Sequence, residues 1–171
     1  MQDSARPDPM PHFIEVARAI REPGQPVTAL AALDKALEGA IGHRLFTVLA
    51  VNLEKNENRR YYSNRPREYP VGGVKPIVQD SPIAHKVMLD GICHINHDYA
   101  QLSRVFFDHE LIRSLGCESS INVPVRWNGR TVGMLNLLHR SGWYRDEDIP
   151  TLSIFAALAT PALQAIIAER R

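Results

Sequence analysis

The sequence predicts one α+β domain, in which a central antiparallel β-sheet carries the N- and C-terminal helices on one face and a roof of loops and short helices over the other. At both ends of the chain, apolar residues recur every three or four positions, as in amphipathic helices. From His43 onward the pattern changes to short runs rich in β-branched and aromatic residues, which are typical of strands. Two such runs flank Asn128-Gly129, a pair that favours the tight type I′ turn of a hairpin.

Composition limits the class of protein. A chain of 171 residues with 44% hydrophobic residues fits one domain with a proper core. The net charge of +1, with both signs interspersed, gives no reason to expect nucleic acid or a membrane surface as a partner. The apolar runs look too short to cross a bilayer, no signal peptide is visible, and two cysteines make no disulfide framework. We therefore expect a cytoplasmic protein.

The N-terminal half is predicted to contain helices followed by a hairpin. Residues 1–9 are predicted to be a disordered leader, 10–25 a helix and the break at Pro23-Gly24, and 26–171 the folded domain. A second helix occupies residues 27–41. Strands at residues 45–51 and 60–63 are expected to pair around a turn at 54–58.

The C-terminal half begins with an irregular, proline-rich stretch over residues 66–82. The elements expected after it are a helix opened by Ser81-Pro82 and ending near 87, a strand at 92–95, a loop or short helix at 98–105, a helix at 108–114, strands at 119–126 and 131–138, and a helix at 146–169 kinked by Pro161. Because the strands form hairpins and the terminal helices share one face, the middle segment must cross the other face. A sheet roofed in this way commonly encloses a ligand cavity.

Two consecutive strands carry a resemblance to a known family. Residues 114–125, Ser-Leu-Gly-Cys-Glu-Ser-Ser-Ile-Asn-Val-Pro-Val, are followed by residues 128–139, Asn-Gly-Arg-Thr-Val-Gly-Met-Leu-Asn-Leu-Leu-His, and then by Asp146-Glu147-Asp148. This pattern resembles the GAF domain, and the order of elements extends the resemblance over residues 26–169.

The resemblance implies a cytosolic input domain that binds a small molecule, such as a cyclic nucleotide or a metabolite, and dimerises through its terminal helices. Such domains usually sit beside an output domain, and no residues are left over for one here. A separate signalling protein is therefore an expected partner, beside the small molecule and a second copy of the chain. The signature of the cyclic-nucleotide subgroup is missing from the sequence.

The expected cavity lies between the strand that bears Ser119 or Asn122 and the segment from Tyr62 to Phe107. In an apolar strand, the amide of Asn122 must find hydrogen-bond partners, from a ligand or from an outward-facing position. Arg59-Arg60 is interpreted first as solvated charge and second as a contact for an anionic ligand. The candidate ligand-binding residues are Tyr62, His94, His97, Tyr99, Phe106, Asp108, Ser119 and Asn122.

Two enzymatic alternatives remain open. Cys117 and Cys93 invite comparison with the free methionine-(R)-sulfoxide reductases, which are GAF domains that use one thiolate for attack and a second cysteine for resolution. Cys117, however, replaces an aliphatic residue of the family strand, which predicts a buried, inert thiol. A metal would be held by His94, His97 and His109, although loop histidines more often make ordinary hydrogen bonds. We predict neither a metal nor a cofactor, and a binding domain rather than an enzyme.

Overall fold

The computed structural model describes residues 5–169. The helices are α1 (Met10–Ile20), α2 (Val27–Ala40), the π-helical turn η1 (Ile83–Leu89), α3 (Tyr99–Val105), α4 (His109–Ser114), the short 3₁₀ turn η2 (Asp146–Asp148) and α5 (Ile149–Ala168). The strands are β1 (Leu45–Asn52), β2 (Glu57–Ser63), β3 (Val74–Pro76), β4 (His94–Asn96), β5 (Ser119–Trp127) and β6 (Arg130–His139).

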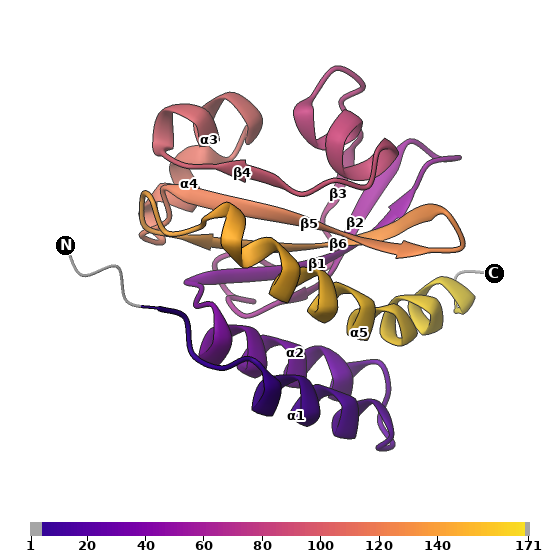
Figure 1. The fold of residues 1–171 in the computed structure, drawn as a ribbon. Helices are drawn as coiled ribbons and strands as arrows, with labels where there is room; N and C mark the ends of the chain where they lie inside the picture. Colours follow the sequence, from indigo (N-terminus) through magenta and orange to yellow (C-terminus); the bar gives the residue numbers. More distant parts are fainter. Residues whose placement is uncertain (1–4, 170–171) are drawn as a thin grey trace.

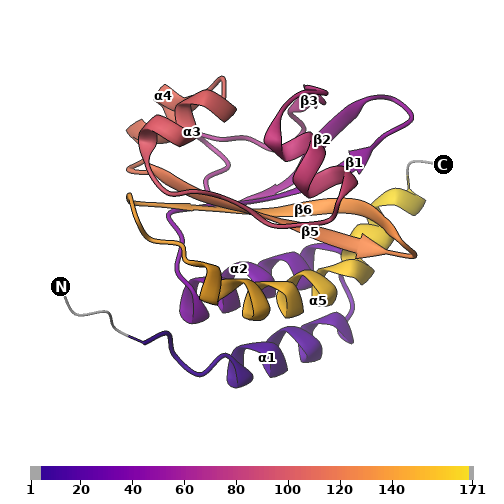
Figure 2. The ribbon, with the colours of Figure 1, turned by 45° about the horizontal axis from the view of Figure 1, so that its top comes forward.

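A six-stranded antiparallel sheet with the order β3-β2-β1-β6-β5-β4 forms the middle layer. Helices α1, α2 and α5 lie on one side of it, and η1, α3 and α4 lie on the other (Figures 1 and 2). We call these sides the helix face and the roof face. The predicted α+β class, with terminal helices on one face and a roof over the other, is confirmed.

The helix face holds the largest hydrophobic core. Strand alternation sends Phe46 and Val48 of β1, and Leu135 and Leu137 of β6, to this face, where they meet Phe155 of α5. All five side chains are almost completely buried. Helix α1 packs on α2 and α5 as the outermost element (Figure 2). Burial of this apolar area is the main source of stability for the fold.

Helix α5 approaches the sheet closely at one glycine. A Cβ atom on Gly133 of β6 would lie 2.5 Å from Cδ1 of Leu163 and 2.5 Å from the backbone carbonyl oxygen of Leu49 in β1, so a larger residue would displace both the Leu163 side chain and the β1 backbone. The helix continues through Pro161, which is exposed to solvent, and ends at Ala168. By length and composition the stretch Asp146–Ala168 could cross a membrane, but its apolar side packs into this core, as core helices do.

The β5–β6 hairpin confirms the Asn-Gly prediction. Asn128 and Gly129 both have positive φ angles, 49° and 75°, as a type I′ turn requires. The predicted helices and strands are otherwise present with small shifts at their ends. The irregular stretch over residues 66–82 additionally contains β3, a three-residue strand that pairs with β2.

The segment before α1 makes defined contacts from Arg6 onward. Arg6 Nε and Nη2 donate to the two carboxylate oxygens of Asp148, each at 2.9 Å, and Nη1 donates to the carbonyl of Ile41. Residues 1–4 of the predicted leader lie outside the described residues. Within its described part, an ion pair joins the start of the chain to the start of α5.

Candidate ligand-binding cavity

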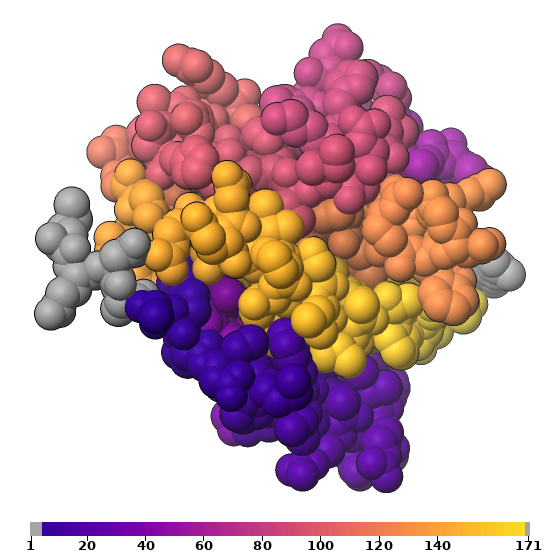
Figure 3. Space-filling view, viewed as in Figure 1, coloured from indigo at the N-terminus to yellow at the C-terminus, as the bar shows by residue number. Residues whose placement is uncertain are grey.

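A cavity of about 600 Å³ lies between the roof face of the sheet and the segments that cross it. Its floor is formed by alternate residues of β1, β5 and β6, namely Thr47, Leu49, Asn122, Met134, Asn136 and Leu138. Its walls come from β2, β3, η1 and the α3–α4 region, including Arg60, Lys75, Ile83, Met88 and Phe106. Figure 3 shows these middle segments, in magenta and salmon, covering the upper side of the molecule. The volume is in the range of sites for small organic ligands.

Polar side chains form a row across the floor. Asn122, Asn136 and Thr47 stand opposite one another on β5, β6 and β1. Asn122 Nδ2 donates to Asn136 Oδ1 at 2.7 Å, and Asn136 Nδ2 donates to Thr47 Oγ1 at 3.3 Å. Asn122 was predicted to need hydrogen-bond partners, and Asn136, its neighbour in the sheet, supplies one of them.

A β-bulge in β2 determines which side chains face the cavity. Tyr62 pairs with Val48 and Arg60 pairs with Leu49, so Tyr61 is the extra residue. Both tyrosines pack against the helix-face core, and Arg60 turns to the roof face. The placement of Tyr62 in the cavity was wrong, because the prediction assumed regular alternation through this strand.

Arg60 is held rigidly although it is charged and only 6% exposed. Its Nη1 donates to the carbonyl of Pro70 at 2.7 Å, and its Cζ lies 3.7 Å from the centroid of the Tyr69 ring. The backbone N–H of Arg60 also donates to Gly73, which secures the loop before β3. A guanidinium stacked on an aromatic ring in a desolvated site is a strong anchor for an anion. The interpretation of this residue as solvated charge was wrong.

Tyr69, Lys75 and Asp108 form a cluster beside Arg60. Asp108 Oδ2 accepts from the Tyr69 hydroxyl at 2.6 Å and from Lys75 Nζ at 3.0 Å. Burial, and next the Asp108 carboxylate, raise the pKa of Tyr69 well above its usual value, so the hydroxyl stays protonated and donates. Burial lowers the pKa of Lys75 despite the opposing effect of Asp108, and Arg60 lowers it further. The cluster thus holds a second positively charged side chain, Lys75, near Arg60, and the carboxylate of Asp108 pairs with Lys75.

Several buried polar atoms around the cavity have no hydrogen-bond partner among residues 5–169. They are Asn58 Oδ1, Arg60 Nε, Asp108 Oδ1 and Asn122 Oδ1. Buried polar groups in proteins are nearly always paired, because an unpaired group loses the free energy of its hydration. Three of these atoms are on residues that line the cavity, and the fourth is on the Asp108 carboxylate that bonds to the lining residues Tyr69 and Lys75, so unused hydrogen-bonding capacity is concentrated here.

The remaining predicted ligand residues are divided by the structure. Phe106 and Asn122 line the cavity, and Asp108 reaches it through Tyr69 and Lys75. Ser119 points away, since its hydroxyl donates to the carbonyl of Arg140 at 2.7 Å. His94, His97 and Tyr99 are not among the lining residues. His109, expected only as a metal ligand, does line the cavity.

The histidines considered for a metal have separate partners. His94 Nε2 lies 3.2 Å from Asn96 Oδ1, and His109 Nδ1 lies 2.7 Å from the Tyr99 hydroxyl. His97 is exposed, and its carbonyl accepts from Gly142. Over the described range 5–169, no three His, Cys, Asp or Glu side chains form a group that could hold a metal ion.

The two cysteines lie in different apolar clusters. Cys117 is fully buried with Leu45, Leu102 and Leu138 under the roof, whereas Cys93 packs against the helix-face core. Burial raises the pKa of each thiol to about 11. Both thiols are therefore protonated at neutral pH, which removes the nucleophilic form.

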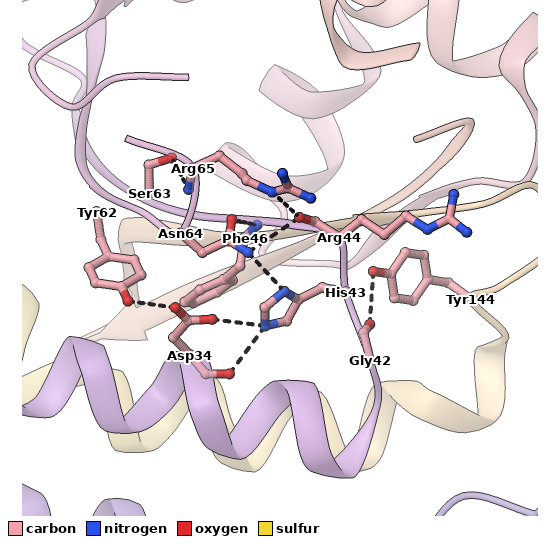
Figure 4. Close-up of polar contacts among 10 residues, drawn as sticks. All are labelled: Asp34, Gly42, His43, Arg44, Phe46, Tyr62, Ser63, Asn64, Arg65 and Tyr144. Atoms are coloured by element: carbon pink, nitrogen blue, oxygen red, sulfur yellow. Dashed lines mark hydrogen bonds and ion pairs between the residues drawn. The ribbon is translucent and has the colours of Figure 1, made fainter. Parts of the chain in front are cut away.

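Tyr62 belongs to a polar network on the helix face, next to α2 (Figure 4). Its hydroxyl donates to Asp34 Oδ2 at 2.6 Å, and His43 Nε2 lies 3.0 Å from Asp34 Oδ1. Asn64 continues the network, because its Oδ1 accepts from the backbone N–H of Phe46. These bonds join α2 to the start of β1 and the end of β2, so they serve the fold.

Comparisons with known proteins agree on the fold. A family model described as a GAF domain matches residues 26–164. The GAF domain from a phosphoenolpyruvate-protein phosphotransferase of Coxiella burnetii superposes with a TM-score of 0.74 at 14% identity, covering 95% of this chain and 97% of that one. The free methionine-R-sulfoxide reductase from Neisseria meningitidis, solved with its substrate, gives 0.70 at 17% identity, covering 97% and 96%.

A methyl-accepting chemotaxis protein, residues 122 to 287, is also similar, with a TM-score of 0.69 at 18% identity and coverage of 92% of this chain and 99% of that one. No curated protein matches the chain at a significant level. At these identities the solved structures establish a shared architecture and leave the ligand to be inferred from the cavity itself.

Proposed function

Since the chain belongs to the GAF domain family, whose members are commonly small-molecule sensors, we propose that it binds a small organic molecule in the roof-face cavity and acts as a cytoplasmic sensor. The observation that carries this proposal is the group of four buried polar atoms around the cavity that lack partners among residues 5–169. A bound molecule would supply those partners. A cavity that only packed the roof onto the sheet would be lined by apolar or fully paired groups.

A sensor is favoured over a cysteine-dependent reductase. The reduction of a sulfoxide by two cysteines needs a reactive thiolate in the cavity and a second thiol within reach. Here the pKa of both thiols is raised to about 11, and neither Cys93 nor Cys117 is among the residues that line the cavity. The likeness to the Neisseria meningitidis enzyme concerns the fold.

Self-association and a separate signalling partner stay predictions. Helices α1 and α5 pack on each other and expose Ile14 and Ile154, at 43% and 47%. A second copy of the chain would cover these side chains.

Native mass spectrometry of freshly purified protein tests the proposal and also reports the number of chains in the assembly. We expect a small molecule to co-purify with the wild-type chain and to be lost from Ile83→Trp, which fills the cavity from η1 at a half-exposed position. Leu89→Trp, at an exposed position of the same element, is the matched control and should retain the molecule. Retention of the same molecule by Ile83→Trp would place it elsewhere and contradict the proposal.

A further inference from the structure

The cavity specifies the chemical class of its ligand through both its charges and its unpaired atoms. Two cations, the buried Arg60 and the partly buried Lys75, line the cavity, and the partly buried carboxylate of Asp108, which is not itself a lining residue, pairs with Lys75. The exposed charges at the margin, Asp80 and Arg104, balance each other. The buried part of the site therefore carries one positive charge in excess, and a buried charge without a counterion is strongly disfavoured.

The donors that remain for a ligand are on the same two cations. Arg60 Nε is buried and has no acceptor in the described part of the chain. Lys75 has three N–H groups, of which one donates to Tyr69 and one to Asp108, so the contacts within residues 5–169 leave one N–H for a ligand. An anionic oxygen group is the natural acceptor for both.

The acceptors that remain are three oxygen atoms. Asn122 Oδ1 is on the floor, Asn58 Oδ1 is on β2, and Asp108 Oδ1 is beside the cations, and residues 5–169 give none of them a donor. The floor fixes the orientation of the Asn122 amide through its bond to Asn136. A ligand that only accepted hydrogen bonds would leave these oxygens unpaired, so it must also carry N–H or O–H groups.

We propose that the ligand is a small organic monoanion of the carboxylate class that also carries neutral N–H or O–H donors. The carboxylate accepts from Arg60 Nε and Lys75 Nζ, and the donors reach Asn122 and Asn58, whose unpaired oxygens belong to lining residues. A dianion exceeds the single excess charge, and a cation would be repelled by both Arg60 and Lys75. This inference rests on the proposed function, since it concerns the same cavity.

The test is a thermal-shift and calorimetry screen with three matched sets of probes. The first set contains acids with a donor, such as 4-hydroxyphenylacetate, indole-3-acetate and N-acetyl amino acids. The second contains their neutral primary amides, and the third contains acids that lack the donor, such as phenylacetate. We expect the first set to contain the strongest binders and each acid to bind at least roughly tenfold more tightly than its amide.

Variants of Arg60 in β2 test whether this residue causes the preference for acids over amides. Arg60→Gln should weaken binding of the acids by roughly tenfold or more and leave the amides unchanged. Arg59→Gln changes an exposed charge one residue away and is the matched control. Because Arg60 also secures the loop before β3, Arg60→Lys is a second variant that keeps the positive charge without Nε, and it should show a smaller loss. The melting temperature of each variant reports whether the fold is intact.

The outcomes separate the two proposals. Amides that bind as tightly as their acids would overturn the monoanion inference while leaving the cavity as a binding site. Equal affinity of acids with and without a donor would overturn the role of the three oxygens. If no probe binds and no molecule co-purifies, the proposed function falls together with this inference.

Discussion

The two faces of the sheet are built from the same strands and differ in how their polar groups are treated. On the helix face, the partly exposed carboxylate of Asp34 is paired with Tyr62 and His43, and the buried carboxylate of Asp148 is paired with Arg6. On the roof side, four buried polar atoms have no partner among the described residues. A fifth such atom, Nδ1 of His12, is on α1, away from the cavity. The difference shows that unpaired buried polar atoms are concentrated on the roof side, which is the capacity that the proposed ligand would use.

The largest expected effect is on the stability of the helix face. Phe155→Ala removes a fully buried ring from the centre of the core and should lower the free energy of unfolding by about 3–5 kcal/mol. The matched control is Phe107→Ala on the roof side, where the ring is 80% exposed and the loss should stay below about 0.5 kcal/mol. Urea denaturation followed by circular dichroism measures both. Equal losses would mean that the stability does not reside in the helix-face core.

A pair of polar substitutions should change stability in opposite directions. Tyr62→Phe removes the donor to Asp34 and should lower the free energy of unfolding by about 1–2 kcal/mol. Asn58→Leu replaces a buried amide whose oxygen has no partner in residues 5–169, and it should raise that free energy by up to about 1 kcal/mol. Denaturation of the ligand-free protein gives both values. A loss of stability in Asn58→Leu would indicate that this amide serves the fold.

The smallest expected effect concerns pH at the end of β6. His139 stacks on Trp143, with ring centroids 3.9 Å apart, and its Nδ1 accepts from the backbone N–H of Arg140. Burial, and then the charges of Arg44 and Arg140, lower the pKa of His139 from 6.5 to about 4. Between these values the unfolded chain binds more protons than the folded chain, so stability is lost as the pH falls from about 6.5 to about 4.

The contribution of this histidine is measured by comparing the wild type with His139→Gln over that range. The variant should show a flatter dependence of unfolding free energy on pH, because the substitution removes one titrating group. His97→Gln is the control, since His97 is exposed. Curves of equal slope for wild type and His139→Gln would show that His139 is protonated equally easily in both states.

Periodic patterns made most of the fold predictable. The sequence pattern and the final structure agree wherever the local signal is strong. Examples are the apolar helical periodicity of α2 and α5, the β-branched and apolar residues of β1 and β6, and the Asn128-Gly129 turn. Of the predicted site residues, Asn122 on such an element and Phe106 after α3 line the cavity. Asn122 stood out because it is a polar residue in an apolar strand, and it lies on the cavity floor.

The rest of the site depends on irregular backbone. Tyr62 turns away from the face that Arg60 occupies because of a bulge, and a bulge leaves no periodic signal in a short polar strand. Tyr69 and Lys75 are brought to Asp108 by the proline- and glycine-rich stretch, whose path is set by tertiary contacts. Residues 58–62 of β2 show the limit: neighbours in sequence divide between the two faces in an order that only the register reveals.

The single extra residue in β2 has an evolutionary consequence. Because Tyr61 is the inserted position, Arg60 and Tyr62 would pair with Leu49 and Val48 on the same faces if that residue were deleted. Loss of one codon would then remove an aromatic ring that packs against the helix-face core and leave Arg60 on the side of the cavity. An insertion before Arg60 would instead turn the guanidinium away from the cavity. A change of one residue in the length of β2 can thus alter the charge that faces the cavity without substituting a residue of the floor.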